Sequence, residues 1–392
     1  MNPSHRHADV IVIGGGVIGC SIAYHLARQK VSVLLLEKAG LASGSSGACD
    51  GFVTLQSKKP GIHLELAQAS LELFPALAAD LPLDIEFEQK GCLVVIEGRP
   101  ELEVMRDFAR RRSREGVEVR LLSGREAREL EPVLADDLCG ATFNEQEGQV
   151  NPLKLTLGLA RGAEQLGARI RTGQEVVGLL GRSGKIEGVK TKTAEYWAGT
   201  VVNAGGVLAP RIGLMSGLKL PIEPRRGQLL VTEAKEPRLS RGLLSSRYIA
   251  AKFDPLIAAQ GGGGCAIEQT ASGNFLLGST REFVGHDRQT SLQGLQTIAG
   301  RTSRIIPGLK ELKVIRSFAG LRPYTPDGLP LLGPVPGLEG LYISAGHEGD
   351  GIALAPITGR LMAQLITRAG TDFLLEAFNP DRFGAGDGGG QS

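Results

Sequence analysis

Glycines and one carboxylate near the N-terminus are spaced as a dinucleotide site requires. Gly14, Gly16 and Gly19 follow an apolar run, Val10 to Ile13, and Glu37 ends a second apolar run about 20 residues further on. Gly14 permits a tight turn, Gly16 lets the backbone approach a pyrophosphate, and Gly19 lets a helix pack against a strand. Helix N-terminal N–H groups favour phosphates, and a carboxylate accepts hydrogen bonds from ribose hydroxyls. The stretch predicts dinucleotide binding; the alternative is a glycine-rich turn that binds nothing.

A loop of small residues, Leu41 to Val53, follows this carboxylate. Ser43, Ser45 and Ser46 offer hydroxyl groups, and the glycines between them let the backbone approach a ligand. Because the loop directly follows the strand that carries the ribose-binding residue, a second phosphate contact is natural there. The alternative is a flexible surface loop.

Helices and strands must alternate along the chain to position these residues. An amphipathic segment, Cys20 to Gln29, follows the first glycines, and Val31 to Leu36 forms the next strand. Further helices are predicted over 64–77 (ending near Pro75), 101–115, 123–130, 153–166, 292–306 and from a C-terminal glycine elbow to about 367. Further strands are predicted over 85–96 (two short ones), 168–171, 175–180, 186–191, 199–206, 228–232, 274–278 and 341–344.

Composition limits the class of protein. With 392 residues, about two domains are expected, and 42% apolar residues suffice for packed cores. The formal charge of +2 does not indicate nucleic-acid binding. Five scattered cysteines without a C-x-x-C pair argue for a reducing compartment and against an iron–sulfur or zinc site. The early first strand and the absence of a long apolar run predict a cytoplasmic protein without a signal peptide or a transmembrane segment.

Four separated motifs carry a family resemblance. They are the fingerprint from Gly14 to Glu37, the loop from Ser43 to Gly51, GTVVNAGG at 199–206, and GLRP…DGLPLLG…GHEGDGIALAPITG within 320–359. Together they resemble the flavoprotein family of D-amino acid, glycine and sarcosine oxidases, over nearly the whole chain. Within that family the sequence is most similar to the β (catalytic) subunits of dye-linked D-hydroxyproline, opine and proline dehydrogenases, through SGACDGFVTLQSKKPG at 46–61 and GHEGDGI at 346–352.

The resemblance implies an α/β fold in which a Rossmann-like FAD-binding domain is interleaved with a smaller α+β substrate domain built on an antiparallel sheet. The FAD-binding domain is expected at 1–83, 146–220 and 316–378, the substrate or interaction domain at 84–145 and 221–315, and a disordered tail at 379–392. It also implies that FAD is held by Gly14, Gly16, Gly19, Glu37, Lys38, Ser45, Ser46, Asp50, Gly51, Val176, Ala204, Gly205, Gly346, Gly349, Asp350, Gly351 and Ile352.

Three residues are candidates for catalysis. Arg322 matches the family's substrate-carboxylate arginine, and a guanidinium can hold a carboxylate bidentately; the alternative is a surface arginine before a proline turn. Tyr248 is a candidate for a substrate contact, or it only packs in a strand. His347 could serve as a general base, although in this family it more often supports the turn.

Departures from the family narrow the expected activity. Glycine oxidases carry arginine and asparagine in the elbow where this chain has Gly349 and Asp350, so specificity for glycine is not expected. The flavin-linking cysteine of monomeric sarcosine oxidases has no counterpart near Arg322, so FAD should be noncovalent. The segment 250–272, with Gly261 to Cys265, is longer than in the simple oxidases and is either an interaction loop facing a partner subunit or second flavin, or a disordered excursion.

Three functional hypotheses follow from the resemblance. The first is an FAD-dependent dehydrogenase that oxidises the C–N bond of an amino or imino acid by hydride transfer. It would be the catalytic subunit of a hetero-oligomer whose partner subunits carry the electrons onward. FMN at a subunit interface is a further possibility. The second is a free-standing glycine, sarcosine or D-amino acid oxidase that uses oxygen. The third is a non-catalytic assembly subunit that keeps FAD as structure.

Overall fold

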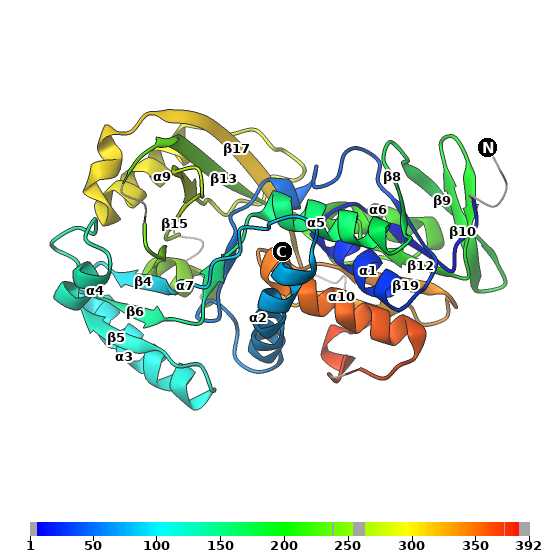
Figure 1. Cartoon of the computed structure of the whole chain (residues 1–392), viewed down its shortest axis with the longest axis horizontal. Helices are drawn as coiled ribbons and strands as arrows, with labels where there is room; N and C mark the ends of the chain where they lie inside the picture. The colour runs from blue at the N-terminus through cyan, green and yellow to red at the C-terminus, as the bar shows by residue number, and fades with distance from the viewer. Residues whose placement is uncertain (1–5, 237–238, 254–262, 372, 384–392) are drawn as a thin grey trace, which may run out of the picture.

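The computed structural model describes residues 6–236, 239–253, 263–371 and 373–383. Two large sheets dominate it, and Figure 1 shows the eight-stranded sheet on the left and the six-stranded sheet on the right. This mixed α/β architecture, with a separate and mainly antiparallel second sheet, confirms the predicted fold class.

The six-stranded sheet carries the predicted dinucleotide fingerprint. Its order is β18-β19-β12-β1-β2-β8, and the five strands from β19 to β8 run parallel. The bounds are β1 (Val10–Ile13), β2 (Val33–Leu36), β8 (Arg169–Arg171), β12 (Thr200–Asn203), β18 (Leu331–Pro334) and β19 (Leu341–Ala345). Every residue of β1 and β2 is buried, as expected for continuous apolar runs covered on both faces of a parallel sheet.

Four helices surround this sheet or extend from it: α1 (Val17–Arg28), α2 (Ile62–Asp80), α5 (Pro152–Gln165) and α10 (Gly351–Thr367). The helices α1 and α10 lie close together because Gly359 has no side chain: a Cβ there would lie 2.2 Å from Ser21 Oγ. That hydroxyl donates to the Ala355 carbonyl oxygen at 2.7 Å. Segments more than 300 residues apart in sequence are thus joined beside the first glycines.

Two of the predicted elements differ from the structure in length or in number. The helix expected to end near Pro75 continues to Asp80, because Phe74 and Leu77 on either side are buried in the core and hold the chain helical despite the missing N–H. Of the two strands expected over 85–96, only β4 (Cys92–Ile96) forms, while Glu88 makes an isolated bridge with Gln149.

The eight-stranded sheet has the order β17-β13-β16-β15-β14-β4-β6-β5, and its pairs are antiparallel except β14 with β4. Its other strands are β5 (Arg120–Ser123), β6 (Gly140–Asn144), β13 (Glu223–Ala234), β14 (Gly242–Ser245), β15 (Ala266–Gln269), β16 (Asn274–Gly278) and β17 (Val314–Tyr324). The helices α3 (Arg99–Arg114), α4 (Gly124–Leu130), α7 (Ser246–Phe253) and α9 (Leu292–Ile305) belong to this part. Strands β13 and β17 form a long ribbon that extends toward the other sheet (Figure 1).

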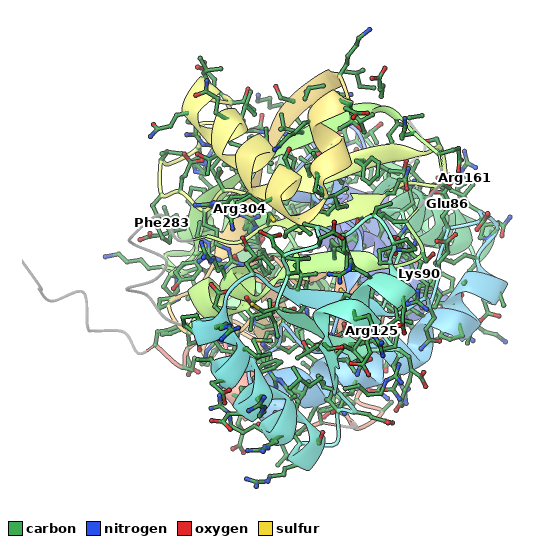
Figure 2. All side chains as sticks on the ribbon, turned by 90° about the vertical axis from the view of Figure 1, so that its left-hand side faces the viewer. Glu86, Lys90, Arg125, Arg161, Phe283 and Arg304 are labelled. Carbon is green, nitrogen blue, oxygen red and sulfur yellow. The ribbon has the colours of Figure 1, made fainter. Side chains whose placement is uncertain are left out.

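Shorter elements complete the described chain. They are β3 (Phe52–Val53) paired with β7 (Gly148–Gln149), the three-stranded sheet β9 (Val176–Arg182), β10 (Lys185–Thr191) and β11 (Glu195–Trp197), the helix α6 (Ala209–Gly213), and 3-10 turns at Ser45–Gly47, Gly206–Leu208, Leu214–Ser216, Pro307–Glu311 and Glu376–Phe378. No helix among the described residues has the length and apolar character needed to cross a bilayer. Figure 2 shows the end of the molecule that carries the eight-stranded sheet, with Phe283 at its surface.

The proposed domain division remains a prediction. Strand β17 runs across the expected boundary between 315 and 316. In the expected tail, Arg382 forms an ion pair with Asp327 at 2.8 Å, while residues 384–392 lie outside the described residues. Gly261 and Gly262 of the glycine run also lie outside them, and Cys265 is buried just before β15.

Candidate functional site

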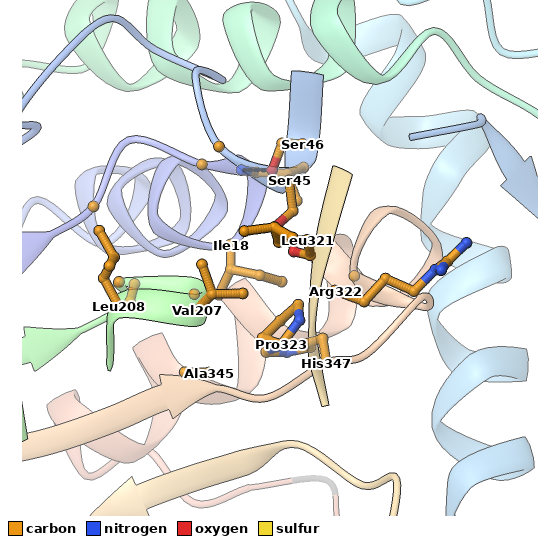
Figure 3. Close-up of a pocket in the computed structure, with 18 of the residues that line it drawn as sticks. Ile18, Ser45, Ser46, Val207, Leu208, Leu321, Arg322, Pro323, Ala345 and His347 are labelled. Carbon is orange, nitrogen blue, oxygen red and sulfur yellow. Dashed lines mark hydrogen bonds between the residues drawn. The ribbon is translucent and has the colours of Figure 1, made fainter. Parts of the chain in front are cut away.

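A cavity of about 690 Å³ connects the two sheets. On one side it is lined by residues at the carboxyl ends of the parallel strands, among them Gly14, Glu37 and Ala204; on the other it is lined by residues of β13 and β17. Figure 3 shows Ile18, Val207 and Leu208 at one end of this cavity and Arg322 at the other. The crevice outside the carboxyl ends of parallel strands is the usual ligand site of such sheets.

The N-terminus of α1 opens into this cavity. Gly14 has φ +116°, and a Cβ there would lie 2.5 Å from the Ala204 carbonyl oxygen, so only glycine fits the turn. No side chain caps α1 at Gly16, but Ser46 from the small-residue loop accepts a hydrogen bond from Val17 N at 3.0 Å. The neighbouring hydroxyl of Ser45 donates to the Leu321 carbonyl oxygen, which ties the loop to β17.

Glu37 is positioned by the backbone of both neighbouring turns. Its carboxylate accepts hydrogen bonds from Gly15 N at 2.7 Å and from Ala39 N at 2.8 Å, one on each oxygen. Each oxygen keeps a second lone pair for a further donor. Glu37 also lines the cavity, so its carboxylate can accept a further hydrogen bond there; its role in binding a ribose stays a prediction.

The N-terminus of α10 opens into the same cavity through Gly351 and Ile352. The preceding residue, Asp350, does not cap the helix with its side chain. Its buried carboxylate instead lies 2.6 Å from Lys58 Nζ and 3.3 Å from His63 Nε2. The helix N–H groups at this end therefore remain available to an acceptor in the cavity.

Arg322 lies in the cavity wall on β17. Its guanidinium donates to the Thr280 carbonyl oxygen at 3.1 Å and to Ser279 Oγ at 2.6 Å. It fits there because Gly227, on β13, has no side chain: a Cβ at Gly227 would lie 2.4 Å from Arg322 Nη1. In the β13–β17 register Arg225 stands directly opposite Arg322, an arrangement that is unfavourable for like charges unless anions compensate it.

An anion and two aromatic rings partly compensate the positive charge of Arg225. Arg225 forms an ion pair with Glu348 of the elbow, and its guanidinium carbon lies 4.6 Å from the centre of the Tyr324 ring and 5.9 Å from that of Phe283. Glu348 itself has φ +52°, which a non-glycine residue rarely adopts. For Arg322 no salt-bridge partner is found among the described residues.

Tyr248 also lines the cavity, but from helix α7 rather than from a strand. The guanidinium carbon of Arg281 lies 4.5 Å from the centre of its ring. His347 lies buried in the wall, with Nε2 at 3.1 Å from Thr358 Oγ1. Burial lowers the pKa of His347 to about 3, so its ring is neutral near pH 7 and is a poor proton acceptor.

The structure brings most of the predicted site residues into one cavity. Those that line the cavity are Gly14, Gly16, Glu37, Lys38, Ser45, Ser46, Asp50, Val176, Ala204, Gly205, Tyr248, Arg322, Gly346, His347, Gly349, Gly351 and Ile352. Gly19, Gly51 and Asp350 do not line it. A Cβ at Gly19 would lie 1.9 Å from the Gly14 carbonyl oxygen, and one at Gly51 would lie 1.9 Å from that of Val150, so both glycines serve close backbone packing.

Sequence reasoning missed four residues around this cavity: Lys58, Gly227, Glu268 and Arg281. Gly227, Glu268 and Arg281 belong to no local motif that indicates a role. Gly227 follows Arg225 and Arg226 in a strand-like run, and its importance appears only when β13 pairs with β17. A signal was present for Lys58, since it lies within the 46–61 stretch that supports the resemblance.

The residues present fit FAD. Two helix N-termini with available N–H groups, a glycine-rich wall without room for side chains, and a buried carboxylate at the end of β2 suit a diphosphate, a ribose and an anionic ring edge. The cavity volume lies within the usual range for a cofactor site. In the described part of the chain, no three His, Cys, Asp or Glu side chains are grouped as a metal site would require.

Comparisons with known proteins agree with this site. The model of the FAD dependent oxidoreductase family, DAO, matches residues 9–365. The chain is 32% identical to glycine oxidase of Geobacillus kaustophilus over 388 residues, covering 97% of this chain and 98% of that one. It is 30% identical to the hydrogen cyanide synthase subunit HcnC of Pseudomonas protegens, covering 96% and 97%.

A solved structure shares the whole fold. The crystal structure of L-proline dehydrogenase from P. horikoshii matches with a TM-score of 0.87 and 28% sequence identity, over 96% of this chain and 98% of that one. The family resemblance inferred from the motifs is thereby confirmed. The chain belongs to the DAO family of FAD-dependent oxidoreductases.

Proposed function

We propose that this protein is an FAD-dependent dehydrogenase that oxidises the C–N bond of an amino or imino acid of the D-hydroxyproline, opine or proline class. The observation that carries the proposal is the position of Arg322, which lies in the same cavity as the dinucleotide wall. Its guanidinium is oriented by two neutral acceptors, and no salt bridge engages it within the described residues. Its charge is therefore available to a substrate carboxylate.

The chain's own residues would bind and orient the reactants. Arg322 would hold the substrate carboxylate and so fix the Cα–H bond, which is an orientation effect rather than a chemical step. FAD, when bound, supplies the hydride acceptor. The open N-terminus of α10, at Gly351 and Ile352, would favour negative charge on the nearby edge of the bound ring.

FAD is proposed to be held noncovalently. Cys49 is the only cysteine in the cavity wall among the described residues. Its Sγ lies 3.6 Å from the Ser46 carbonyl oxygen, and burial raises the pKa of the thiol well above its usual value, which disfavours the reactive thiolate. Acid precipitation should leave the yellow chromophore in the supernatant; a coloured pellet would contradict noncovalent binding.

Dehydrogenase chemistry is proposed over oxidase chemistry because of the likeness to an L-proline dehydrogenase and the motif at 46–61. The likeness to a glycine oxidase supports the second candidate, a free-standing amino acid oxidase that uses oxygen.

We further propose that the chain is the catalytic subunit of a hetero-oligomer whose partner subunits receive the electrons, with FMN at an interface as one route. The relative named a subunit of hydrogen cyanide synthase supports an assembly of this kind. A cytoplasmic location remains a prediction.

One experiment separates the two candidate activities. The full chain, purified with and without co-purifying partners, is offered D- and L-imino acids, opines, glycine, sarcosine and D-amino acids. We expect reduction of an artificial dye and little hydrogen peroxide. Rapid peroxide formation with glycine, sarcosine or a D-amino acid would favour the oxidase instead.

Variants of Arg322 distinguish both activities from a non-catalytic role in assembly. Replacing Arg322 with alanine removes two charge-assisted hydrogen bonds to a carboxylate, so we expect kcat/KM to fall by about 100-fold, equivalent to about 3 kcal/mol. Arg304→Ala is the matched control, since Arg304 is exposed on α9, pairs with Glu97 at 3.4 Å and does not line the cavity. Unchanged turnover of the assembled complex carrying Arg322→Ala would support the assembly role.

A further inference from the structure

Asp50 is a carboxylate in the wall of the cavity that Arg322 also lines. It belongs to the small-residue loop, Leu41 to Val53. Burial raises the pKa of Asp50, and the positive charge of Arg322 is the largest influence that lowers it. The backbone brings the two segments together, since a Cβ at Gly320 on β17 would lie 2.0 Å from the Ala48 carbonyl oxygen. Among the described residues Asp50 forms no salt bridge, and the backbone N–H of Phe52 also lowers its pKa.

The other carboxylates in the cavity wall are already engaged or lie elsewhere. Glu37 accepts two backbone N–H groups at the end of β2. Glu175 lies 2.5 Å from Lys192 Nζ, and Glu348 is paired with Arg225. Of the carboxylates lining the cavity in the described chain, Asp50 is thus the one available to a ligand held by Arg322.

A second carboxyl group contacts the residue that follows Asp50. Glu268 on β15 is buried and accepts a hydrogen bond from Gly51 N at 2.9 Å, so its oxygen is fixed to the residue that follows Asp50. Two carboxyl groups this close in a buried site do not both ionise readily. Burial first, and the charge of Asp50 second, raise the pKa of Glu268 to about 8. With Asp50 ionised, Glu268 therefore holds a proton near pH 7, and the pair carries one negative charge rather than two.

The proposed reaction needs a base at this place. An amino or imino acid enters mainly as an ammonium carboxylate, and hydride can leave Cα only when the nitrogen has a free lone pair. The carboxylate and the nitrogen of the substrate are attached to the same carbon. When Arg322 binds the carboxylate, the ammonium group is therefore held close to that arginine. His347 has too low a pKa to take the proton efficiently at neutral pH.

We propose that Asp50 receives the proton of the substrate's ammonium group and that Asp50 and Glu268 form a proton-sharing pair in the wall of the site. The inference rests on the proposed function and adds to it a substrate class, a zwitterion whose carboxylate is bound by Arg322 and whose ammonium is bound by Asp50. Two carboxyl groups with different pKa values are a recurrent arrangement for acid–base work.

The protons and electrons of the proposed oxidation balance when FAD is the hydride acceptor. The N–H bond breaks and its proton moves to an Asp50 oxygen, leaving a neutral amine. The Cα–H bond then breaks with its electron pair, which passes to oxidised FAD as hydride, and the nitrogen lone pair forms the C=N bond of the iminium product. The substrate loses two electrons, FAD gains them, and the proton on Asp50 returns to solvent when the product leaves.

Several charged groups face this pair and set its pH dependence. Arg322 and then Lys58 act on Asp50 by their positive charges. Lys58 is itself buried and paired with Asp350. Lys90 acts on Glu268 by its positive charge. Burial raises the pKa of the Cys49 thiol well above its usual value, so this thiol adds no negative charge to the pair. The cations favour one negative charge on the pair, and burial disfavours a second.

The test compares three variants of the full FAD-loaded chain: Asp50→Asn, Glu268→Gln and the control Glu103→Gln, whose side chain is exposed on α3. Anaerobic bleaching of the flavin is followed from pH 6 to pH 10 with the amino or imino acid that reduces dye fastest. We expect Asp50→Asn to slow bleaching about 100-fold at pH 7, and the deficit to shrink as rising pH removes the substrate's own proton. Glu268→Gln is expected to remove the change in rate near pH 8.

Binding provides a readout that does not depend on turnover. 2-Methylproline, which has no Cα–H to lose as hydride, and its nitrogen-free isostere 2-methyltetrahydrofuran-2-carboxylate are titrated against the flavin spectrum. Asp50→Asn should weaken 2-methylproline at least 10-fold and leave the isostere as tight or tighter, since only 2-methylproline has an ammonium. If Asp50→Asn retains no FAD, Glu268→Gln decides, and an unchanged pH profile for it would overturn the proposal.

The failures of the two proposals can be told apart. If no amino or imino acid bleaches the wild-type flavin, the proposed function falls and this inference with it. If the wild type is bleached normally while Asp50→Asn matches Glu103→Gln in pH profile and in affinity for 2-methylproline, only the role of Asp50 is refuted.

Discussion

Gly227→Ala tests whether the position of Arg322 matters as much as its charge. A Cβ at Gly227 would lie 2.4 Å from Arg322 Nη1, 2.5 Å from Nη2 and 2.6 Å from Cζ, whereas ordinary contacts begin at 3.4 Å. The guanidinium must therefore move by about 1 Å. The side chain can do so without unfolding β13 or β17, but it would lose the alignment set by Ser279 and Thr280.

The expected loss follows from that shift. A misplacement of about 1 Å typically costs about 100-fold in rate, or about 2.7 kcal/mol. We expect kcat/KM for the best amino or imino acid to fall by this factor, with the flavin spectrum and the melting temperature nearly unchanged. Gly178→Ala is the matched control, since Gly178 lies on β9 and its nearest neighbour would be Lys190 Cβ at 3.7 Å.

Three results would refute this reasoning. Wild-type kcat/KM in Gly227→Ala would show that the guanidinium position is not critical. An equal loss in Gly178→Ala would show that any added methyl group in a strand has the same effect. A loss that follows the fraction of FAD released would show that the cofactor, rather than the substrate, depends on Gly227.

Two further predictions concern the elbow. Lys58→Met should lower the free energy of unfolding by about 3 kcal/mol, because it leaves the buried Asp350 carboxylate without its nearest cation. Adding Asp350→Asn to the same chain should restore part of that free energy. A shift of the urea midpoint equivalent to less than 1 kcal/mol would contradict this prediction. The pKa of His347 is lowered from 6.5 to about 3, so the unfolded chain binds a proton that the folded chain does not, and stability should fall as pH drops from 6.5 toward 3. His347→Asn should flatten this dependence relative to the wild type in urea titrations at stepped pH, and parallel curves would refute it.

Local patterns predicted the dinucleotide part of the fold well. The glycines from Gly14 to Gly19, the carboxylate at Glu37 and the elbow at Gly351 are each set by neighbours within a few residues, so spacing alone indicates their geometry. The helix through Pro75 was misjudged because burial of Phe74 and Leu77 outweighs a missing N–H. Tyr248 was considered as a strand residue, yet it lies on α7.

The substrate end was less predictable because pairing between distant strands builds it. Arg322 was found through a family motif, but its support by Gly227 depends on a register between β13 and β17 that no local pattern encodes. Glu268 reaches Gly51 across 217 residues, and nothing in the sequence around either residue indicates the contact. Such long-range neighbours have no period or motif from which to infer them.

The long separation between the two helix N-termini has a consequence for biosynthesis. The cofactor wall needs the turn at Gly14 and the helix that begins at Gly351, joined by Ser21 and Ala355, which lie 334 positions apart. A ribosome must therefore deliver nearly the entire polypeptide before the pocket closes, and earlier nascent intermediates have no complete place for FAD. Uptake of yellow colour during translation would consequently mark the completion of the chain.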